Sequence, residues 1–176
     1  HPTTRRQRQM CIRDSFNIAR EHLEKKSQIF VVCPYIEESE NSDIKAAEKV
    51  YELYKSEFNK YNVELLHGKM KADEKENKML KMKDGEIDIM VSTVVIEVGI
   101  DITNATLMII ESAERFGLNQ LHQLRGRVGR GDKQSECIFH ITEGKSFSKI
   151  TKDGQERLNA IEPVSYTHLR AHETTC

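Results

Sequence analysis

The sequence has 176 residues, with 27 lysines and arginines, 28 aspartates and glutamates, and a formal net charge of −1 at pH 7. This length suits one domain with a sizeable core. Because the charge is balanced, any nucleic-acid site has to be a local basic one. We expect no membrane span and no signal peptide. The four cysteines have no paired spacing, so we expect neither disulfides nor a zinc site, and a reducing, cytoplasmic location fits best.

The two ends of the chain differ in composition from its interior. All lysines lie between Phe16 and Pro163, whereas residues 1–15 and 164–176 are rich in arginine, threonine and histidine without a sustained period. These ends resemble translated adapter sequence, so we expect them to be non-native or disordered flanks. The predicted domain therefore covers residues 16–163.

Taken in chain order, the hydrophobic pattern alternates between short apolar runs and amphipathic segments. The predicted helices cover residues 17–25, 44–58, 73–82, 117–128 and 146–161; Ser15 is expected to cap the first and Gly85 to stop the third. The predicted strands cover residues 28–34, 63–66, 87–92, 106–111 and 136–142. Residues 100–102 are expected to extend or edge the sheet. This alternation predicts an α/β fold, a parallel sheet with helices on both faces and right-handed crossovers. Ligands of such sheets bind at the carboxyl ends of the strands.

The stretch over residues 120–131 combines helical spacing with glycines. On a helix, one face is apolar and is formed by Leu118, Leu121, Leu124 and Val128. The opposite face carries Gln123, Arg127 and Arg130. Guanidinium groups suit phosphate oxygens, so two of them on a packed helix form a candidate anion clamp. The alternative interpretation is an ordinary solvated helix face.

The sequence contains no complete phosphate loop. Gly144-Lys145-Ser146 lies between a predicted strand and a predicted helix, but Phe139 occupies the position where the pattern requires its first glycine. The glycines after the helix over 117–128 are in the wrong order for a dinucleotide fingerprint. A nucleotide site built by this chain alone is therefore not expected.

Residues 92–101 form a second candidate site, because they follow a predicted buried strand. The hydroxyl and amide of Thr93 can hold a nucleic-acid phosphate, and Gly99 permits a tight backbone path. Beyond the strand end, Glu97 and Asp101 can bind a ribose or orient an arginine. The alternative is turn chemistry with solvated carboxylates.

Together these segments resemble the second motor domain of superfamily-two helicases. His67-Gly68-Lys69-Met70 resembles the strand-end motif that touches the nucleic-acid backbone, and residues 92–101 and 123–130 resemble motifs V and VI. The amino-acid sequences of residues 93–101, 113–118 and 120–135 resemble those of RecG-type helicases. These are ATP-dependent enzymes that remodel branched DNA and stalled replication forks in recombination and repair. The resemblance covers residues 29–161 and implies a RecA-like fold.

The resemblance also implies a role for each candidate residue. The arginines match arginine fingers, which reach the γ-phosphate of ATP bound to a first motor domain. The implied catalytic set is Arg127, Arg130 and Gln123. The implied cofactor-binding set is Glu97, Gly99 and Asp101. The implied DNA-backbone contacts are His67, Gly68 and Thr93.

The sequence also departs from the complete helicase pattern. It contains no Walker A lysine and no Asp-Glu box, so the first motor domain, which would hold ATP and most of its Mg²⁺, is expected to be missing. The wedge domain and the helical hairpin that couples ATP turnover to translocation are expected to be missing too. The expected partners are branched or forked DNA and these missing domains, with no membrane. The isolated fragment is expected to be inactive. The alternatives are the equivalent domain of a transcription-repair coupling DNA translocase and a non-catalytic nucleic-acid binding module.

Overall fold

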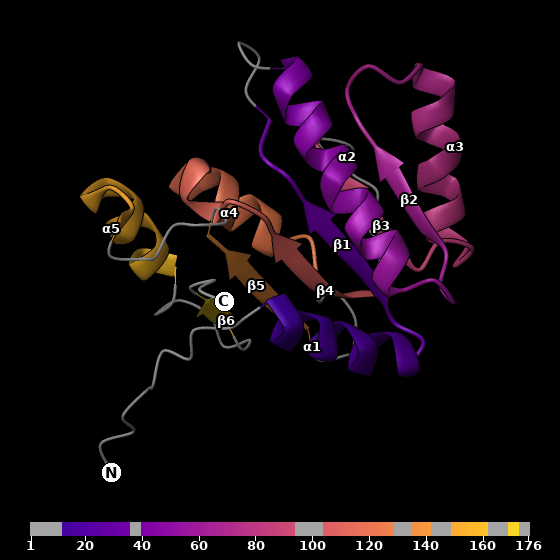
Figure 1. Ribbon diagram of the computed structural model, residues 1–176, viewed down its shortest axis with the longest axis horizontal. Helices are drawn as coiled ribbons and strands as arrows, with labels where there is room; N and C mark the ends of the chain where they lie inside the picture. The colour runs from indigo at the N-terminus through magenta and orange to yellow at the C-terminus, as the bar shows by residue number, and fades with distance from the viewer. Residues whose placement is uncertain are drawn as a thin grey trace.

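The computed structural model describes residues 12–35, 40–93, 104–128, 135–141, 149–161 and 169–172. Its elements alternate along the chain as the hydrophobic pattern predicts (Figure 1). They are α1 (Ile12–Glu24), β1 (Gln28–Val32), α2 (Glu40–Glu57), β2 (Val63–Leu66), α3 (Ala72–Lys83), β3 (Ile89–Ser92), β4 (Ala105–Ile110), a 3₁₀ turn (Ala113–Arg115), α4 (Leu118–Arg125), β5 (Glu136–His140), α5 (Lys152–Ile161) and β6 (Leu169–His172).

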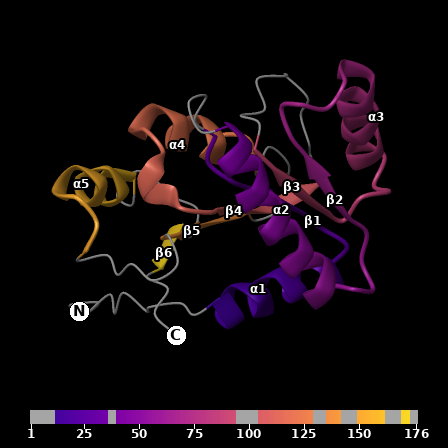
Figure 2. The same ribbon diagram turned by 45° about the horizontal axis from the view of Figure 1, so that its top comes forward.

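The strands form one six-stranded sheet in the order β2-β3-β1-β4-β5-β6. Every neighbouring pair is parallel, so the predicted α/β parallel sheet is confirmed. The two views of the ribbon place α3 beside β2, at one edge of the sheet, and α5 towards β5 and β6, at the other edge (Figures 1 and 2). The central strand is β1, which pairs with β3 on one side and β4 on the other.

Alternate residues of the strands face two different apolar clusters. In β1, Ile29 and Val31 belong to a cluster that includes side chains of α1 and α2, whereas Phe30 and Val32 belong to a cluster that includes side chains of α3, α4 and α5. All residues of β1 are buried. A parallel strand covered on both faces needs apolar residues at nearly every position, which explains why these strands read as nearly continuous apolar runs; the buried amide of Gln28 in β1 is satisfied by donating to the carbonyls of Met82 and Ile87.

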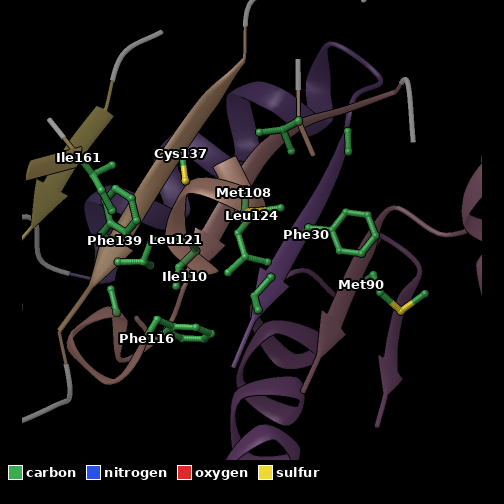
Figure 3. Packing of buried hydrophobic residues seen from close by; sticks show 14 of the residues in the cluster. Phe30, Met90, Met108, Ile110, Phe116, Leu121, Leu124, Cys137, Phe139 and Ile161 are labelled. Carbon is green, nitrogen blue, oxygen red and sulfur yellow. The ribbon is translucent and has the colours of Figure 1, made fainter. Parts of the chain in front are cut away.

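The packing on each face agrees with the predicted helix stripes. On the first face, the ring of Phe16 lies edge-on to Tyr54 and Phe58, with centroids 5.2 and 5.5 Å away, an arrangement that the ring quadrupoles favour. On the other face, Leu121 and Leu124 of α4 lie among the apolar side chains of the strands (Figure 3). The helices are therefore held by apolar contact with the sheet.

The structure differs from the predicted elements at both ends of the chain. Helix α1 begins at Ile12, so Ser15 lies inside the helix, fully buried, and the prediction that it caps a later helix is wrong. Strand β6 pairs with β5 in a segment for which the sequence predicted no element. Helix α5 begins at Lys152, later than predicted. The assignment of residues 1–15 and 164–176 to non-native sequence stays a prediction.

Two buried histidines lie at opposite ends of the strands. His140, at the carboxyl end of β5, has its Nδ1 2.9 Å from Oε1 of Glu111 and its Nε2 2.5 Å from Oγ of Ser15. His22 has its Nδ1 2.6 Å from Oγ1 of Thr106, near the start of β4. Burial lowers the pKa of His22. Burial also acts to lower the pKa of His140, but the charge and hydrogen bond of Glu111 raise it above its ordinary value.

These opposite shifts predict opposite pH dependences of stability. The raised pKa of His140 means that its contribution is complete below about pH 6.5, the unfolded value, and is lost as the pH rises through the folded pKa. The lowered pKa of His22 means that its contribution is lost as the pH falls below about 6.5. Urea unfolding between pH 5 and 8 is expected to show that His140→Gln lowers the free energy of unfolding most at low pH and that His22→Gln lowers it most at high pH. If the loss of unfolding free energy changed with pH in the same direction for both variants, this assignment would be contradicted.

Candidate functional site

The carboxyl ends of β2 and β3 bring two of the predicted contact residues together. These strands are neighbours in register, with Leu66 opposite Ser92. The next residues are His67 and Thr93, and the N–H of Thr93 donates to the carbonyl of Leu66 at 3.1 Å. Because the two strands end at the same level, the side chains of His67 and Thr93 leave the sheet at adjacent positions.

Both side chains hold a buried polar atom that has no hydrogen-bond partner. Thr93 is 1% exposed and its Oγ1 is unpaired, and Nδ1 of the half-buried His67 is unpaired too, among the residues that the structure describes. Buried polar atoms are nearly always paired in folded proteins, and an unpaired one costs about 1–3 kcal/mol. These two atoms lie at the carboxyl ends of neighbouring strands, the edge of a parallel sheet at which ligands bind.

A turn over residues 67–70 carries the predicted Gly68. The N–H of Met70 donates to the carbonyl of His67 at 3.2 Å, and Nζ of Lys75 donates to the carbonyl of Gly68 at 2.7 Å. The φ of Gly68 lies outside the left-handed region, and a Cβ there would meet only Oη of Tyr35, at 4.0 Å. The turn therefore does not require glycine for its backbone conformation.

The predicted arginine face begins on α4 but continues beyond it. The helix ends at Arg125, so the expectation of a helix to residue 128 is wrong. Gly126 keeps a right-handed conformation, and the N–H of half-buried Arg127 donates to the carbonyl of Leu124 at 3.0 Å. Gln123 is exposed on the helix. Arg127 is thus held in a turn directly after α4.

The apolar face of the same stretch agrees with the sequence prediction. Leu121, Leu124 and Val128 are buried, and Leu118 packs against their cluster. Burial of these side chains fixes which side of α4 faces the strands. The polar side that carries Gln123 is therefore turned away from the sheet.

Several predicted site residues fall outside the described part of the chain. The motif V residues predicted to bind the cofactor are in this group, as is the second arginine of motif VI. They are Glu97, Gly99, Asp101 and Arg130. The residues 100–102 expected to extend the sheet and the Gly144-Lys145-Ser146 stretch also lie outside the described residues.

Two charged residues at these sites were missed by sequence reasoning. Lys75 contacts the candidate turn, as described above. Arg125, the last residue of α4, has a buried Nη1 without a hydrogen-bond partner among the described residues, and its charge acts to lower the pKa of the Cys137 thiol, which burial raises to about 12. Neither residue belongs to an apolar stripe or a known motif position, so no periodicity in the sequence indicates its contacts.

Neither a metal site nor a membrane-spanning helix is found in the part of the chain that the structure describes. In that part of the chain, no group of three or more histidine, cysteine, aspartate or glutamate side chains has the geometry to hold a metal ion. Among the helices described, none has both the length and the apolarity to cross a membrane.

Comparison with protein families and curated proteins places this arrangement among helicases. A family described as "helicase conserved C-terminal domain" matches residues 12–132. The ATP-dependent DNA helicase RecG of Streptococcus pneumoniae is 56% identical over 152 residues, which are 86% of this chain and 22% of that protein. RecG of Synechocystis is 46% identical over 148 residues, 84% of this chain and 17% of that protein. The chain spans about a fifth of the length of these relatives.

Solved structures agree with the sequence comparison. A structure of RecG bound to a three-way DNA junction matches 88% of this chain and 19% of that chain, with a TM-score of 0.71 and 36% identity. The C-terminal domain of the DEAD-box protein Dbp5 matches 92% of this chain with a TM-score of 0.58 and 18% identity. The second likeness concerns the fold alone. The first agrees with a RecG-type second motor domain.

The unpaired hydroxyl of Thr93 generates a prediction about stability. Replacing it with a methyl group in Thr93→Val removes an unsatisfied buried polar atom while keeping the side-chain shape, so we expect the free energy of unfolding to stay unchanged or to rise by about 1 kcal/mol. Thr106→Val is the matched control, because Thr106 is equally buried but its hydroxyl is hydrogen-bonded to His22. Urea unfolding should show the control to be destabilised, and a loss of similar size in both variants would contradict the unpaired state of Thr93.

Proposed function

The chain belongs to the family of helicase conserved C-terminal domains, and from this premise we propose that it is the second motor domain of an ATP-dependent DNA helicase that remodels branched DNA and stalled replication forks in recombination and repair. The names of its relatives, ATP-dependent DNA helicase RecG, support the ATP-dependent activity. A similar protein solved on a three-way DNA junction supports branched DNA as the substrate. We place the complete protein in the cytoplasm, with its DNA.

The observation that carries the DNA contact is the pair of unpaired buried atoms at adjacent strand ends. Oγ1 of Thr93 and Nδ1 of His67 can both donate hydrogen bonds to phosphate oxygens when His67 carries its proton on Nδ1. Phosphates are the same in every base sequence, so binding at this site is independent of sequence and weakens with salt. Both properties suit a motor that moves along DNA of any sequence.

On the nucleotide side, the proposed catalytic residues are Arg127, Arg130 and Gln123. Arg127 presents a guanidinium from a turn held against α4, which fits the oxygens of a polyphosphate. The first motor domain would bind ATP and most of its Mg²⁺, and ATP supplies the phosphoryl group that is transferred to water. In this proposal the two arginines neutralise charge on the γ-phosphate, a role worth ~10³–10⁵ in rate in related enzymes.

The other side of the nucleotide would be contacted by motif V. Glu97, Gly99 and Asp101 are the proposed residues there, with the carboxylates bonding the ribose or orienting an arginine. The partners of this domain in the complete protein would be the first motor domain and a wedge domain that recognises the fork. Each half of the ATP site would then come from a different motor domain.

The DNA contact predicts weak, sequence-independent binding by the chain. A ¹⁵N-labelled chain titrated with an oligothymidylate, and separately with a three-way DNA junction, should show chemical-shift changes at residues 67–70 and 93. His67→Ala removes one hydrogen bond and is expected to weaken binding roughly fivefold.

The matched control is His122→Ala, because His122 is also half-buried but lies on α4. This variant should bind like the unaltered chain. Shift changes confined to surfaces away from the ends of β2 and β3 would contradict the proposed contact.

The divided ATP site predicts no turnover by the chain alone. Phosphate release from ATP, measured with and without DNA, should stay at the level of buffer, because positioning and neutralisation of the phosphates need both motor domains. Turnover that disappears in the double variant Arg127→Ala/Arg130→Ala would overturn this prediction.

A further inference from the structure

The turn over residues 67–70 is restrained from α3 by a lysine. Lys75 lies in the first half of α3, and its half-buried side chain donates from Nζ to the carbonyl of Gly68 at 2.7 Å. Among the described residues, the turn is also restrained by the 3.2 Å bond from the N–H of Met70 to the carbonyl of His67 and by a bond from Nζ of Lys69 to Oδ1 of Asn41. The position of His67 therefore depends on a short segment that Lys75 ties to the helix.

Lys78, on the same helix, also donates to a backbone carbonyl, but unlike Lys75 it forms an ion pair with another described residue as well. Lys78 donates to the carbonyl of Leu65 at 2.7 Å and also forms an ion pair with Glu64 at 2.9 Å. Lys75 has its carbonyl bond but no carboxylate within ion-pair distance among the described residues. The two lysines hold β2 and the turn that follows it against the same helix, and Lys75 is the one that reaches the turn.

We propose that Lys75 is a positioning residue for the DNA-backbone contact: its ammonium group fixes the Gly68 carbonyl, and the fixed turn holds His67 beside Thr93. A hydrogen bond from a charged donor is stronger than a neutral one, so the turn keeps one geometry before DNA arrives. In this role Lys75 acts through the turn, without contacting a phosphate. The inference rests on the proposed function of this strand-end site.

The first test measures the turn itself. In Lys75→Met the amide of Met70, which closes the turn, should exchange with solvent faster, whereas amides of β3 should exchange at their former rates. Lys75→Arg keeps a charged donor and should restore slow exchange. The matched control is Lys81→Met, which removes a charge from the exposed last turn of the same helix. Unchanged exchange at Met70 in Lys75→Met would overturn the proposal.

The second test separates positioning from direct phosphate contact. Binding of a fluorescein-labelled oligothymidylate is measured from about 50 to about 200 mM salt. Lys75→Met should bind roughly tenfold more weakly at every salt concentration, with the same dependence of log K on log salt as Lys81→Met. Lys75→Arg should recover most of the affinity. Equal thermal unfolding of the variants is the check on folding.

The remaining outcomes each have a defined meaning. A salt slope about 0.7 shallower for Lys75→Met than for Lys81→Met would make Lys75 a phosphate ligand and overturn the positioning role. Affinity equal to that of Lys81→Met, with faster exchange at Met70, would show that the turn does not control binding and would also overturn it. Absence of binding by the unaltered chain would contradict the proposed DNA contact itself, and with it any role of Lys75 there.

Discussion

The pairing of β1 between β3 and β4 is the constraint on which the rest of the structure depends. A central parallel strand is covered on both faces, so its side chains alternate between two apolar cores, with Ile29 in one and Phe30 in the other. Each core then requires its own helices, α1 and α2 on one face and α3, α4 and α5 on the other. The candidate polar site residues His67 and Thr93 lie where the strands end, beyond the two apolar layers.

The comparison of two buried threonines shows where stability and function diverge. The hydroxyl of Thr106 has a partner in His22, whereas that of Thr93 has none among the residues that the structure describes. The first belongs to the fixed interior of the domain. The second lies beside His67 at the edge where ligands of parallel sheets bind. Its unpaired hydroxyl lowers the stability of the domain until a ligand forms a hydrogen bond with it.

The features that the sequence predicted are those that follow from the spacing of apolar residues and from the conformational preferences of glycine. The bounds of β2 and the apolar stripe of α4 agree with the structure, and Gly85, predicted to stop α3, has a φ of 81°. The end of α4 was missed because the apolar spacing continues to Val128 although the regular helix stops at Arg125. The contact of Lys75 with the Gly68 carbonyl and the effect of Arg125 on Cys137 were missed because a charged side chain that acts on the backbone or on a buried group leaves no periodic signal. The roles of all the predicted site residues stay predictions, and Glu97, Gly99, Asp101 and Arg130 also lie outside the described residues.

The central place of β1 also has a consequence for the order in which the chain can fold. Both partners of β1 come later in the sequence, so a chain emerging from the ribosome presents β1 with two unpaired edges until residues 89–110 have been made. Ile29, Phe30 and Val31 are apolar on both faces of that strand, and unpaired apolar strands associate readily with other chains. Non-local pairing of this kind slows folding. The strand that organises the finished domain is thus exposed on both edges while its partners are being made.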